Sequence, residues 1–396
     1  LLTMPDTKIL NRIDKKFDKL VDSHNCNIKT FFVNSYKKGY SPEFMGQYFE
    51  SSLEYSERKE GGQFYTPKTI VEYMISHLNI TKNSTVLDPA CGCGSFLLTT
   101  YNIFKEKFST EFLKNIFGVD INYDAVKVTR ACLYMQSNFD SSYIDVIKNH
   151  INYGNSIVTN QAIDKNAFNW QVSFDHVMKR GGFDFIIGNP PYVTLNNNRE
   201  FDPAESDYDE IIDGPVNAAS LMIMRSLTLL KHNGMLAFLL PKSMLYVDSY
   251  NKLREHLFKN TQIVSIYDLG AKFKDVRGEQ IILILRKSFS ADNKVLIRTV
   301  KYKDRNINNQ PSFLINQDTL RKMGKMLTFN KIEYYDLINK VSLMGEKLDD
   351  VVSGKICRGL PIGGNSEHIK TTGQGEEVIR GRNIAKFKIK QSIVLS

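Results

Sequence analysis

Asn189, Pro190, Pro191 and Tyr192 form a tetrapeptide directly after the apolar run 183–187, and their residue types suit a planar exocyclic amine. The Asn189 side-chain oxygen and the Pro190 carbonyl can each accept one N–H of an amino group. The Tyr192 ring can lie against the heterocycle that carries this group. Two successive prolines hold φ near about −65°, so the acceptors are fixed before a substrate arrives. A proline pair after a strand can also be a plain loop, so the interpretation depends on context.

A glycine-rich turn lies upstream, within TVLDPACGCGSF at 85–96. The pattern indicates a short buried strand, a turn with Gly92 and Gly94, and the start of a helix. Such a turn lets backbone amides approach a ligand, and a helix N-terminus favours a carboxylate or another negative group. A second predicted strand carries Asp120 near its end, where an acid can meet a ribose diol. Together these features predict a nucleotide-cofactor site.

These blocks, in this order, resemble the adenine-N6 DNA methyltransferases of bacterial restriction-modification systems, which use S-adenosylmethionine. Four pieces carry the resemblance, which spans roughly Gly61 to Lys287: GGQFYTP at 61–67, DPACGCGSF at 88–96, GVDI at 118–121 and GNPPY at 188–192. The cofactor motifs precede the catalytic motif, as in the gamma-type order. GGQFYTP is similar to a segment of type I modification subunits and of type IIG enzymes, which fuse modification and restriction in one chain.

The resemblance implies that residues 63–66 cover the methionine end of S-adenosylmethionine. Thr66 is expected to cap a helix that begins at Pro67, because threonine is a good N-cap and proline suits the first helical position. Asp88 is expected to orient the glycine turn or to meet the cofactor amine, and Asp120 to accept from the ribose hydroxyls. Either acid could instead be a structural turn residue. The full expected cofactor-binding set is Gln63, Phe64, Tyr65, Thr66, Pro67, Asp88, Ala90, Cys91, Gly92, Gly94, Ser95, Asp120, Ile121, Asn155 and Asn189.

Asn155 marks a departure from the family pattern. After the third strand the family often carries an acid that contacts the amino group of the cofactor's adenine, and this chain has Asn155 in Gly154-Asn155-Ser156 instead. An amide oxygen can still accept that hydrogen bond, although the contact is neutral and weaker. Asn155 is equally compatible with a plain turn residue.

The implied function is site-specific methylation of double-stranded DNA at adenine N6, with Asn189, Pro190, Pro191 and Tyr192 as the catalytic residues. N6 is a poor nucleophile because its lone pair is delocalised into the ring. Acceptance of both amino hydrogens would favour a pyramidal nitrogen, so catalysis would depend on alignment and polarisation. The target base must be flipped out of the duplex, and Tyr192 is its expected stacking partner.

Two other functions stay open. NPPY also occurs in enzymes resembling those that methylate a glutamine amide in translation release factors, although those chains are shorter and lack a basic C-terminal segment. The second is a DNA-binding or assembly subunit that keeps the fold without turnover. Besides double-stranded DNA, the expected partner is a specificity subunit, a restriction subunit or a fused nuclease.

Two patterns that could hold metal ions receive a different interpretation. Cys91 and Cys93 have C-x-C spacing, but the other three cysteines are scattered, so no metal site is expected. Carboxylates are frequent at 200–213, yet no acid-x-lysine pattern accompanies them. We interpret this segment as a loop beside the substrate pocket and expect no endonuclease centre here.

Strands alternate with helical stretches from Thr85 to about Lys287, which predicts an α/β fold with a doubly wound, seven-stranded, mostly parallel sheet of the class I methyltransferase type. The strands are expected at 85–88, 117–121, around Ile151, and at 183–187, 235–240, 263–269 and 280–286, and a helix at 216–230. The expected parts are an N-terminal helical segment at 1–60, the methyltransferase domain at 61–330, and a linker with the beginning of a target-recognition domain at 331–396.

The composition fits this interpretation. The 396 residues are 42% hydrophobic, and the formal net charge of +9 is compatible with a polyanionic partner. Basic residues gather after Val351, where we expect phosphate contacts, although a solvated loop face is also compatible with them. They are Lys355, Arg358, Lys370, Arg380, Arg382, Lys386, Lys388 and Lys390. No secretory signal or membrane-spanning run is recognised, and few cysteines suit a reducing cytoplasm. The chain begins without methionine and is compatible with a fragment.

Overall fold

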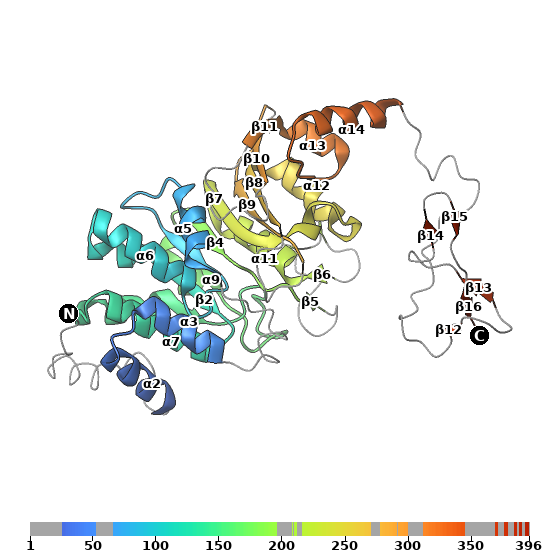
Figure 1. Cartoon of the computed structure of the whole chain (residues 1–396). Helices are drawn as coiled ribbons and strands as arrows, with labels where there is room; N and C mark the ends of the chain where they lie inside the picture. Colours follow the sequence, from blue (N-terminus) through green and yellow to red (C-terminus); the bar gives the residue numbers. More distant parts are fainter. Residues whose placement is uncertain are drawn as a thin grey trace. The chain divides into compact units, whose positions relative to one another are not determined.

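A computed structural model describes the chain at residues 26–52, 66–195, 208, 210–211, 216–270, 278–290, 292–299 and 312–344, and at five short strands after residue 368. Residues 1–339 form one compact unit and residues 340–396 a second one (Figure 1). In the second unit, β12 (Ile369–Lys370), β16 (Ile393–Leu395) and β13 (Glu376–Val378) form one antiparallel sheet, and β14 (Ile384–Ala385) pairs with β15 (Lys388–Ile389). Of the basic residues expected to contact phosphates, Lys370 and Lys388 belong to β12 and β15, and the others lie outside the described residues.

One sheet organises the larger unit, with the strand order β11-β10-β8-β9-β7-β4-β1-β2-β3. The central strands pair in parallel, while β9 is antiparallel to both of its neighbours, β7 and β8. The strands are β1 (Val86–Asp88), β2 (Ile116–Asp120), β3 (Ile151–Tyr153), β4 (Phe183–Gly188), β7 (Leu230–Pro241), β8 (Gln262–Gly270), β9 (Gln280–Arg286), β10 (Lys294–Thr299) and β11 (Ser312–Asn316). The doubly wound, mostly parallel α/β fold is confirmed, and each expected strand is present.

The predicted number of strands, seven, is wrong, because β10 and β11 extend the sheet beside β8. Both lie beyond Lys287, where the family resemblance ends. Their exposed and half-buried positions give a weaker sequence pattern than β4 and β9, in which all residues but one are buried.

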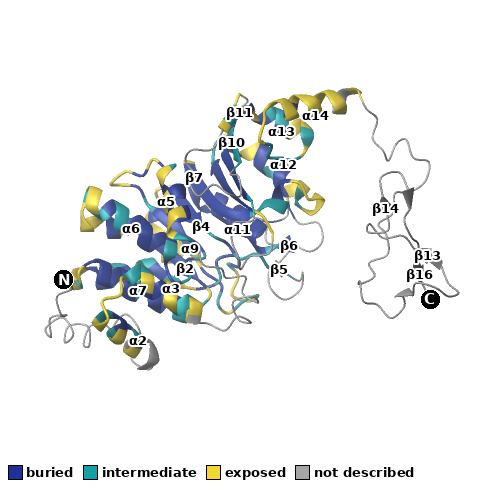
Figure 2. Cartoon of the chain, viewed as in Figure 1, coloured by how far each residue is buried: buried dark blue, intermediate teal, exposed yellow. Residues whose placement is uncertain are grey.

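Helices cover both faces of the sheet, and Figure 2 shows the buried strands between them. On one face, buried residues of α5 (Lys68–Ser76), α6 (Ser95–Phe108) and α7 (Tyr123–Gln136) form one core cluster. On the other, α11 (Ala218–Leu229) and α12 (Asn251–Asn260) contribute to a second cluster. Strand β7 serves both, since Ala237 and Leu239 belong to the first cluster, whereas Leu236 and Phe238 belong to the second.

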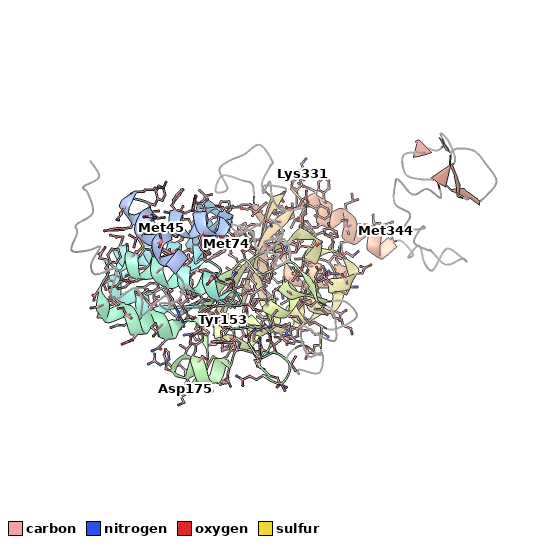
Figure 3. The ribbon with its side chains drawn as sticks, turned by 90° about the horizontal axis from the view of Figure 1, so that it is seen from below. Met45, Met74, Tyr153, Asp175, Lys331 and Met344 are labelled. Carbon is pink, nitrogen blue, oxygen red and sulfur yellow. The ribbon has the colours of Figure 1, made fainter. Side chains whose placement is uncertain are left out.

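Two N-terminal helices, α2 (Cys26–Lys37) and α3 (Pro42–Ser52), precede the sheet. Met45 of α3 is fully buried and shares the first core cluster with Met74 of α5 (both labelled in Figure 3). The part of the N-terminal segment that the structure describes is therefore helical and contributes to the main core. Within the described ranges, no helix has both the length and the apolar character that crossing a bilayer requires.

The helix expected at 216–230 is shorter at both ends. Val216 and Asn217 form β6, which pairs antiparallel with β5 (Thr194–Leu195), and Leu230 begins β7. Helix α11 begins at Ala218 because the Asn217 side chain accepts from Ala219 N at 3.0 Å and caps it.

Candidate active site

A cavity of about 720 Å³ opens at the carboxyl ends of β1, β2, β3 and β4, the edge where doubly wound sheets bind ligands. Most of the predicted site residues line it: Thr66, Asp88, Ala90, Cys91, Gly92, Ser95, Asp120, Ile121, Asn155, Asn189 and Pro191. Pro67, Gly94, Pro190 and Tyr192 are near these residues in sequence but are not among its lining residues. Gln63, Phe64 and Tyr65 lie outside the described residues.

The glycine turn is clamped between α6 and α7. Gly94 has φ +86°, and a Cβ there would meet Thr129 Cγ2 at 2.9 Å, so both its backbone conformation and its surroundings require glycine. The Thr129 hydroxyl donates to the Gly92 carbonyl at 2.8 Å, and Cys91 N donates to the Val119 carbonyl at 3.0 Å. The turn is therefore held in place without a ligand.

Asp120 ties β2 to this turn. Its Oδ2 accepts from Gly92 N at 2.7 Å and its Oδ1 from Asn122 N at 2.8 Å. The residue is 6% exposed, and burial raises the pKa of its carboxyl group. Asp120 therefore has a structural role in the glycine turn. Each oxygen keeps further acceptor capacity, so acceptance from a ribose stays a prediction.

Asp88 ends β1 beneath the cavity and is 1% exposed. Its Oδ1 accepts from Ala90 N at 3.1 Å, so it orients the start of the glycine turn. Burial raises the pKa of Asp88 well above its ordinary value, and the charge of Asp120 raises it further. A Cβ on Gly188 of β4 would lie 2.7 Å from Asp88 Oδ1, so glycine at 188 lets β4 approach this carboxyl group.

Gly188→Ala is expected to destabilise the protein by about 1–3 kcal/mol, because the added methyl group overlaps the Asp88 side chain. Urea unfolding monitored by circular dichroism measures the change. In the Asp88→Ala background the same substitution should cost less, since its clash partner is gone. Equal costs in both backgrounds would show that the clash does not matter.

The sequence predicts that Thr66 caps the following helix, and this prediction is wrong. Helix α5 begins at Lys68, its N-cap position is Pro67, and no side chain caps it. Pro67 has ψ 136° and so precedes the helix instead of entering it. The buried Thr66 hydroxyl accepts from Asn189 Nδ2 at 3.2 Å. Thr66 therefore supports the tetrapeptide after β4.

The tetrapeptide itself is ordered by hydrogen bonds. The Tyr192 hydroxyl lies 2.6 Å from Asn189 Oδ1 and 2.9 Å from the Leu239 carbonyl of β7, and it can donate its one hydrogen to either acceptor. Burial raises the pKa of Tyr192 well above its ordinary value, so the hydroxyl is neutral. The half-buried ring packs against the second core cluster.

Asn155 is held as a turn residue at the cavity wall. Its Oδ1 accepts from Ile157 N at 3.0 Å and from Val158 N at 3.3 Å. Its Nδ2 donates at 2.7 Å to Oδ2 of Asp164, and Asp164 also lines the cavity. The Asp164 Oδ1 accepts from Asn166 N at 2.8 Å. The turn thus presents an acid that lies nine residues further along the chain, which no motif indicated.

Glu50 of α3 is a second lining residue that the motifs did not indicate. Its segment carries only a helical pattern, and nothing in that pattern shows which neighbour the helix meets. Cys91 and Cys93 are buried, and burial raises the pKa of both thiols. In the described part of the chain, no three His, Cys, Asp or Glu residues form a group suited to a metal ion.

Of the acidic segment at 200–213, only three residues are described, and Tyr208 is fully buried. Its hydroxyl donates to the Ile157 carbonyl at 2.5 Å, and Arg225 Nε donates to the Tyr208 oxygen at 3.1 Å. Ile157 lines the cavity, so part of this segment is anchored behind the cavity wall. Lys242, which directly follows β7, forms ion pairs with Asp268 at 2.9 Å and Glu279 at 2.6 Å.

Several characterised proteins are similar to this chain in sequence. The type II methyltransferase M.VspI of Vibrio sp. (strain 343) is 28% identical over 258 residues, which cover 65% of this chain and 55% of that protein. The type II restriction enzyme and methyltransferase RM.Eco57I of Escherichia coli is 24% identical over 263 residues, covering 55% and 26%. The type II methyltransferase M.CvrRI of Paramecium bursaria Chlorella virus XZ-6E is 25% identical over 309 residues, covering 78% and 61%. The chain thus spans between a quarter and two thirds of these relatives.

Solved structures share the fold at low sequence identity. A structure describing complex assembly of the type I restriction-modification system has a TM-score of 0.51 and 14% identity, covering 82% of this chain and 70% of that one. The DrdV–DNA complex has a TM-score of 0.50 and 15% identity, covering 78% and 33%. In sequence, residues 114–274 match a family described as Eco57I restriction-modification methylase. Over this region the chain is similar in sequence to restriction-modification methylases of that family.

Proposed function

We propose that this chain is the catalytic part of an S-adenosylmethionine-dependent DNA methyltransferase that modifies N6 of an adenine flipped out of the duplex. The observation that carries the proposal is that Asn189, which follows β4, lines the same cavity as Asp88 and Asp120, which end β1 and β2. An acceptor suited to an amino group and a nucleotide-type pocket therefore share one space.

The lining residues fit S-adenosylmethionine. The cavity volume of about 720 Å³ lies in the usual range for small-molecule sites, and its acids suit a donor with a positive net charge. Asp120 at the end of β2 and Ile121 after it would hold the nucleoside, and Ser95 at the start of α6 would face the amino-acid end. When bound, S-adenosylmethionine supplies a methyl group activated by its sulfonium.

Asp164 is our candidate for the acceptor of the donor's adenine amino group. Both residues line the cavity, but the single Asn155 oxygen already accepts from two backbone amides. The two Asp164 oxygens accept one hydrogen bond each and keep further acceptor capacity. Asn155 would then act indirectly, because its Nδ2 holds Asp164 Oδ2 at 2.7 Å.

Asn189 would act on the target amine through its side-chain oxygen. In the structure this oxygen accepts from Tyr192, and the Leu239 carbonyl offers the Tyr192 hydroxyl a second acceptor. When an amino group arrives, the tyrosine hydrogen can turn to Leu239 and leave Asn189 to the substrate. Asn189 Nδ2 stays bound to Thr66, so the oxygen keeps its direction.

Donor binding is expected to depend on pH. Burial raises the carboxyl pKa of both Asp88 and Asp120 in the protein alone, while a cationic donor favours their ionised forms. The affinity for S-adenosylmethionine, measured by titration calorimetry, should therefore rise as the pH is raised from the ordinary carboxyl pKa through the raised pKa values of these two groups. Without donor, these two groups favour folding below the ordinary carboxyl pKa, and this contribution is lost as the pH rises through their raised values. An affinity that falls over this range would contradict the assignment.

A methyl-transfer assay tests the proposed function. The purified chain is incubated with S-adenosylmethionine labelled in its methyl group and with either duplex DNA or a glutamine-containing protein substrate. Labelled N6-methyladenine in the DNA is the expected product. Label on a glutamine amide would favour the protein methyltransferase instead, and donor binding without transfer to either substrate would favour a non-catalytic subunit. Because the chain spans only part of its relatives, a recognition module, another subunit or a nuclease outside these residues belongs to the same proposal.

A further inference from the structure

Helix α3 is fixed against the glycine turn and α7 along much of its length. Cys132 Sγ of α7 donates to the Pro42 carbonyl at 3.2 Å, and Gln136 Nε2 donates to Glu43 Oε1 at 2.9 Å. Further along, a Cβ on Gly46 would lie 2.8 Å from the Cys93 carbonyl, so the helix backbone touches the turn. Figure 1 shows α3 beside α7. The helix is thus part of the site's framework.

Glu50 continues the face of α3 that makes these contacts. Positions 43, 46 and 50 lie three and four residues apart, a spacing that places them on one side of a helix. Glu50 lines the main cavity together with Thr66, Cys93 and Ser95. Burial raises the pKa of the Cys93 thiol, and the charge of Glu50 raises it further. This effect agrees with the position of Glu50 beside the glycine turn.

A second cavity of about 210 Å³ adjoins the main one at this point. Glu50, Cys93 and Ser95 line both cavities, and Lys68 of α5 lines the smaller one. Glu50 therefore lies where the two cavities adjoin, and the smaller cavity is also lined by the basic Lys68 and the acidic Glu43. An acid and a base at such a junction suit a zwitterionic group that extends from the larger cavity.

The direction of the donor follows from the order of the strands. Asp120 and Ile121 end β2, and the turn that presents Asp164 follows β3, so the nucleoside lies over this part of the sheet if the proposed function holds. The amino-acid end must then extend toward β1 and α6, where α3 provides the wall. S-adenosylmethionine carries an ammonium and a carboxylate at this end.

We propose that Glu50 of α3 binds the ammonium group of the methyl donor. The proposal rests on the function proposed above and adds a binding residue from the N-terminal helices. Asp88 and Asp120 are both buried. Glu50 is half-buried, so its charge loses less hydration in the protein. The N-terminal helices would thus complete the donor site as well as pack on it.

Ligand pairs that differ only at the amino-acid end test the proposal. Titration calorimetry measures the binding of S-adenosylhomocysteine and of 5′-methylthioadenosine, which lacks the amino acid, to the wild-type chain and to Glu50→Gln. We expect Glu50→Gln to weaken S-adenosylhomocysteine binding about 10-fold or more, because an ammonium–carboxylate contact is lost. Binding of 5′-methylthioadenosine should stay within about 2-fold and show that the variant keeps a folded nucleoside pocket.

Glu43→Gln is the matched control. It removes the same charge from the same helix, and its amide oxygen can still accept from Gln136. Residue 43 lines the smaller cavity but not the main one, in which the donor is placed. This variant should bind both ligands like the wild type. Unchanged S-adenosylhomocysteine binding in Glu50→Gln would overturn the proposal, and so would an equal loss for both ligands. If the wild-type chain bound neither ligand, the proposed function itself would fail.

Discussion

Asn189→Ala is expected to lower the rate of methyl transfer by at least about 100-fold while donor affinity stays close to that of the wild type. The substitution removes the side-chain oxygen proposed to polarise the target amine, and loss of one such aligned acceptor costs rates of this order. It also removes the Asn189 Nδ2 bond to Thr66, which fixes the direction of the oxygen. Single-turnover transfer to duplex DNA measures the rate, and calorimetry measures donor affinity.

Two variants distinguish the role of the Asn189 oxygen as an acceptor from the role of Thr66, which fixes its direction. Asn189→Asp keeps an acceptor oxygen and should retain more activity than Asn189→Ala. Thr66→Val keeps the size of residue 66 but removes the hydroxyl that holds Asn189, so a smaller loss, of about 10-fold, is expected. A wild-type rate in purified Asn189→Ala would exclude a catalytic role for this residue. An unchanged transfer rate together with weak donor binding would make Asn189 a cofactor residue only.

The central strands could be predicted from the sequence because nearly all their residues are buried on both sides. Strand β9 carries the unbroken apolar run 281–285, and β4 is apolar apart from Asp184 and its final glycine, a pattern typical of the middle of a doubly wound sheet. Strands β10 and β11 could not be predicted in the same way, since exposed and half-buried positions dilute their pattern. The strength of the sequence pattern therefore follows the burial of the strand, and the sequence predicts too few strands at the end of the sheet beyond β8.

Site residues within motifs were predictable because neighbours in sequence form one turn. Asp88, Gly92 and Ser95 all line the cavity, and all belong to one strand–turn–helix segment. The motifs do not indicate Asp164 and Glu50 as cavity-lining residues, because tertiary contacts bring these two residues to the cavity. Asp164 depends on the hydrogen bond from Asn155, and Glu50 depends on the packing of α3 against Cys93. Neither contact leaves a local signal in the sequence.

The misassigned role of Thr66 has the same origin. Threonine before proline is a good local capping signal, but its hydroxyl can serve only where the fold directs it. Asn189, more than a hundred residues away in sequence, donates to it at 3.2 Å and connects the segment before α5 to the tetrapeptide after β4. The two motifs that the sequence presented as separate, one for the cofactor and one for catalysis, are thus joined by a hydrogen bond. A change at Thr66 should therefore affect transfer as well as donor binding.

Tyr192→Ala should weaken capture of the flipped adenine by about 1–3 kcal/mol, the usual contribution of an aromatic ring stacked on a base. Tyr192→Phe should retain most of this capture, because the ring remains and only the hydroxyl contacts to Asn189 and Leu239 are lost. Fluorescence of 2-aminopurine placed at the target position reports base extrusion in each variant. The half-buried ring also packs against the core, so Tyr192→Ala must be compared at a temperature where thermal unfolding shows it to be folded. Equal base capture by the alanine and phenylalanine variants would contradict stacking and leave Tyr192 only its hydroxyl contacts near Asn189.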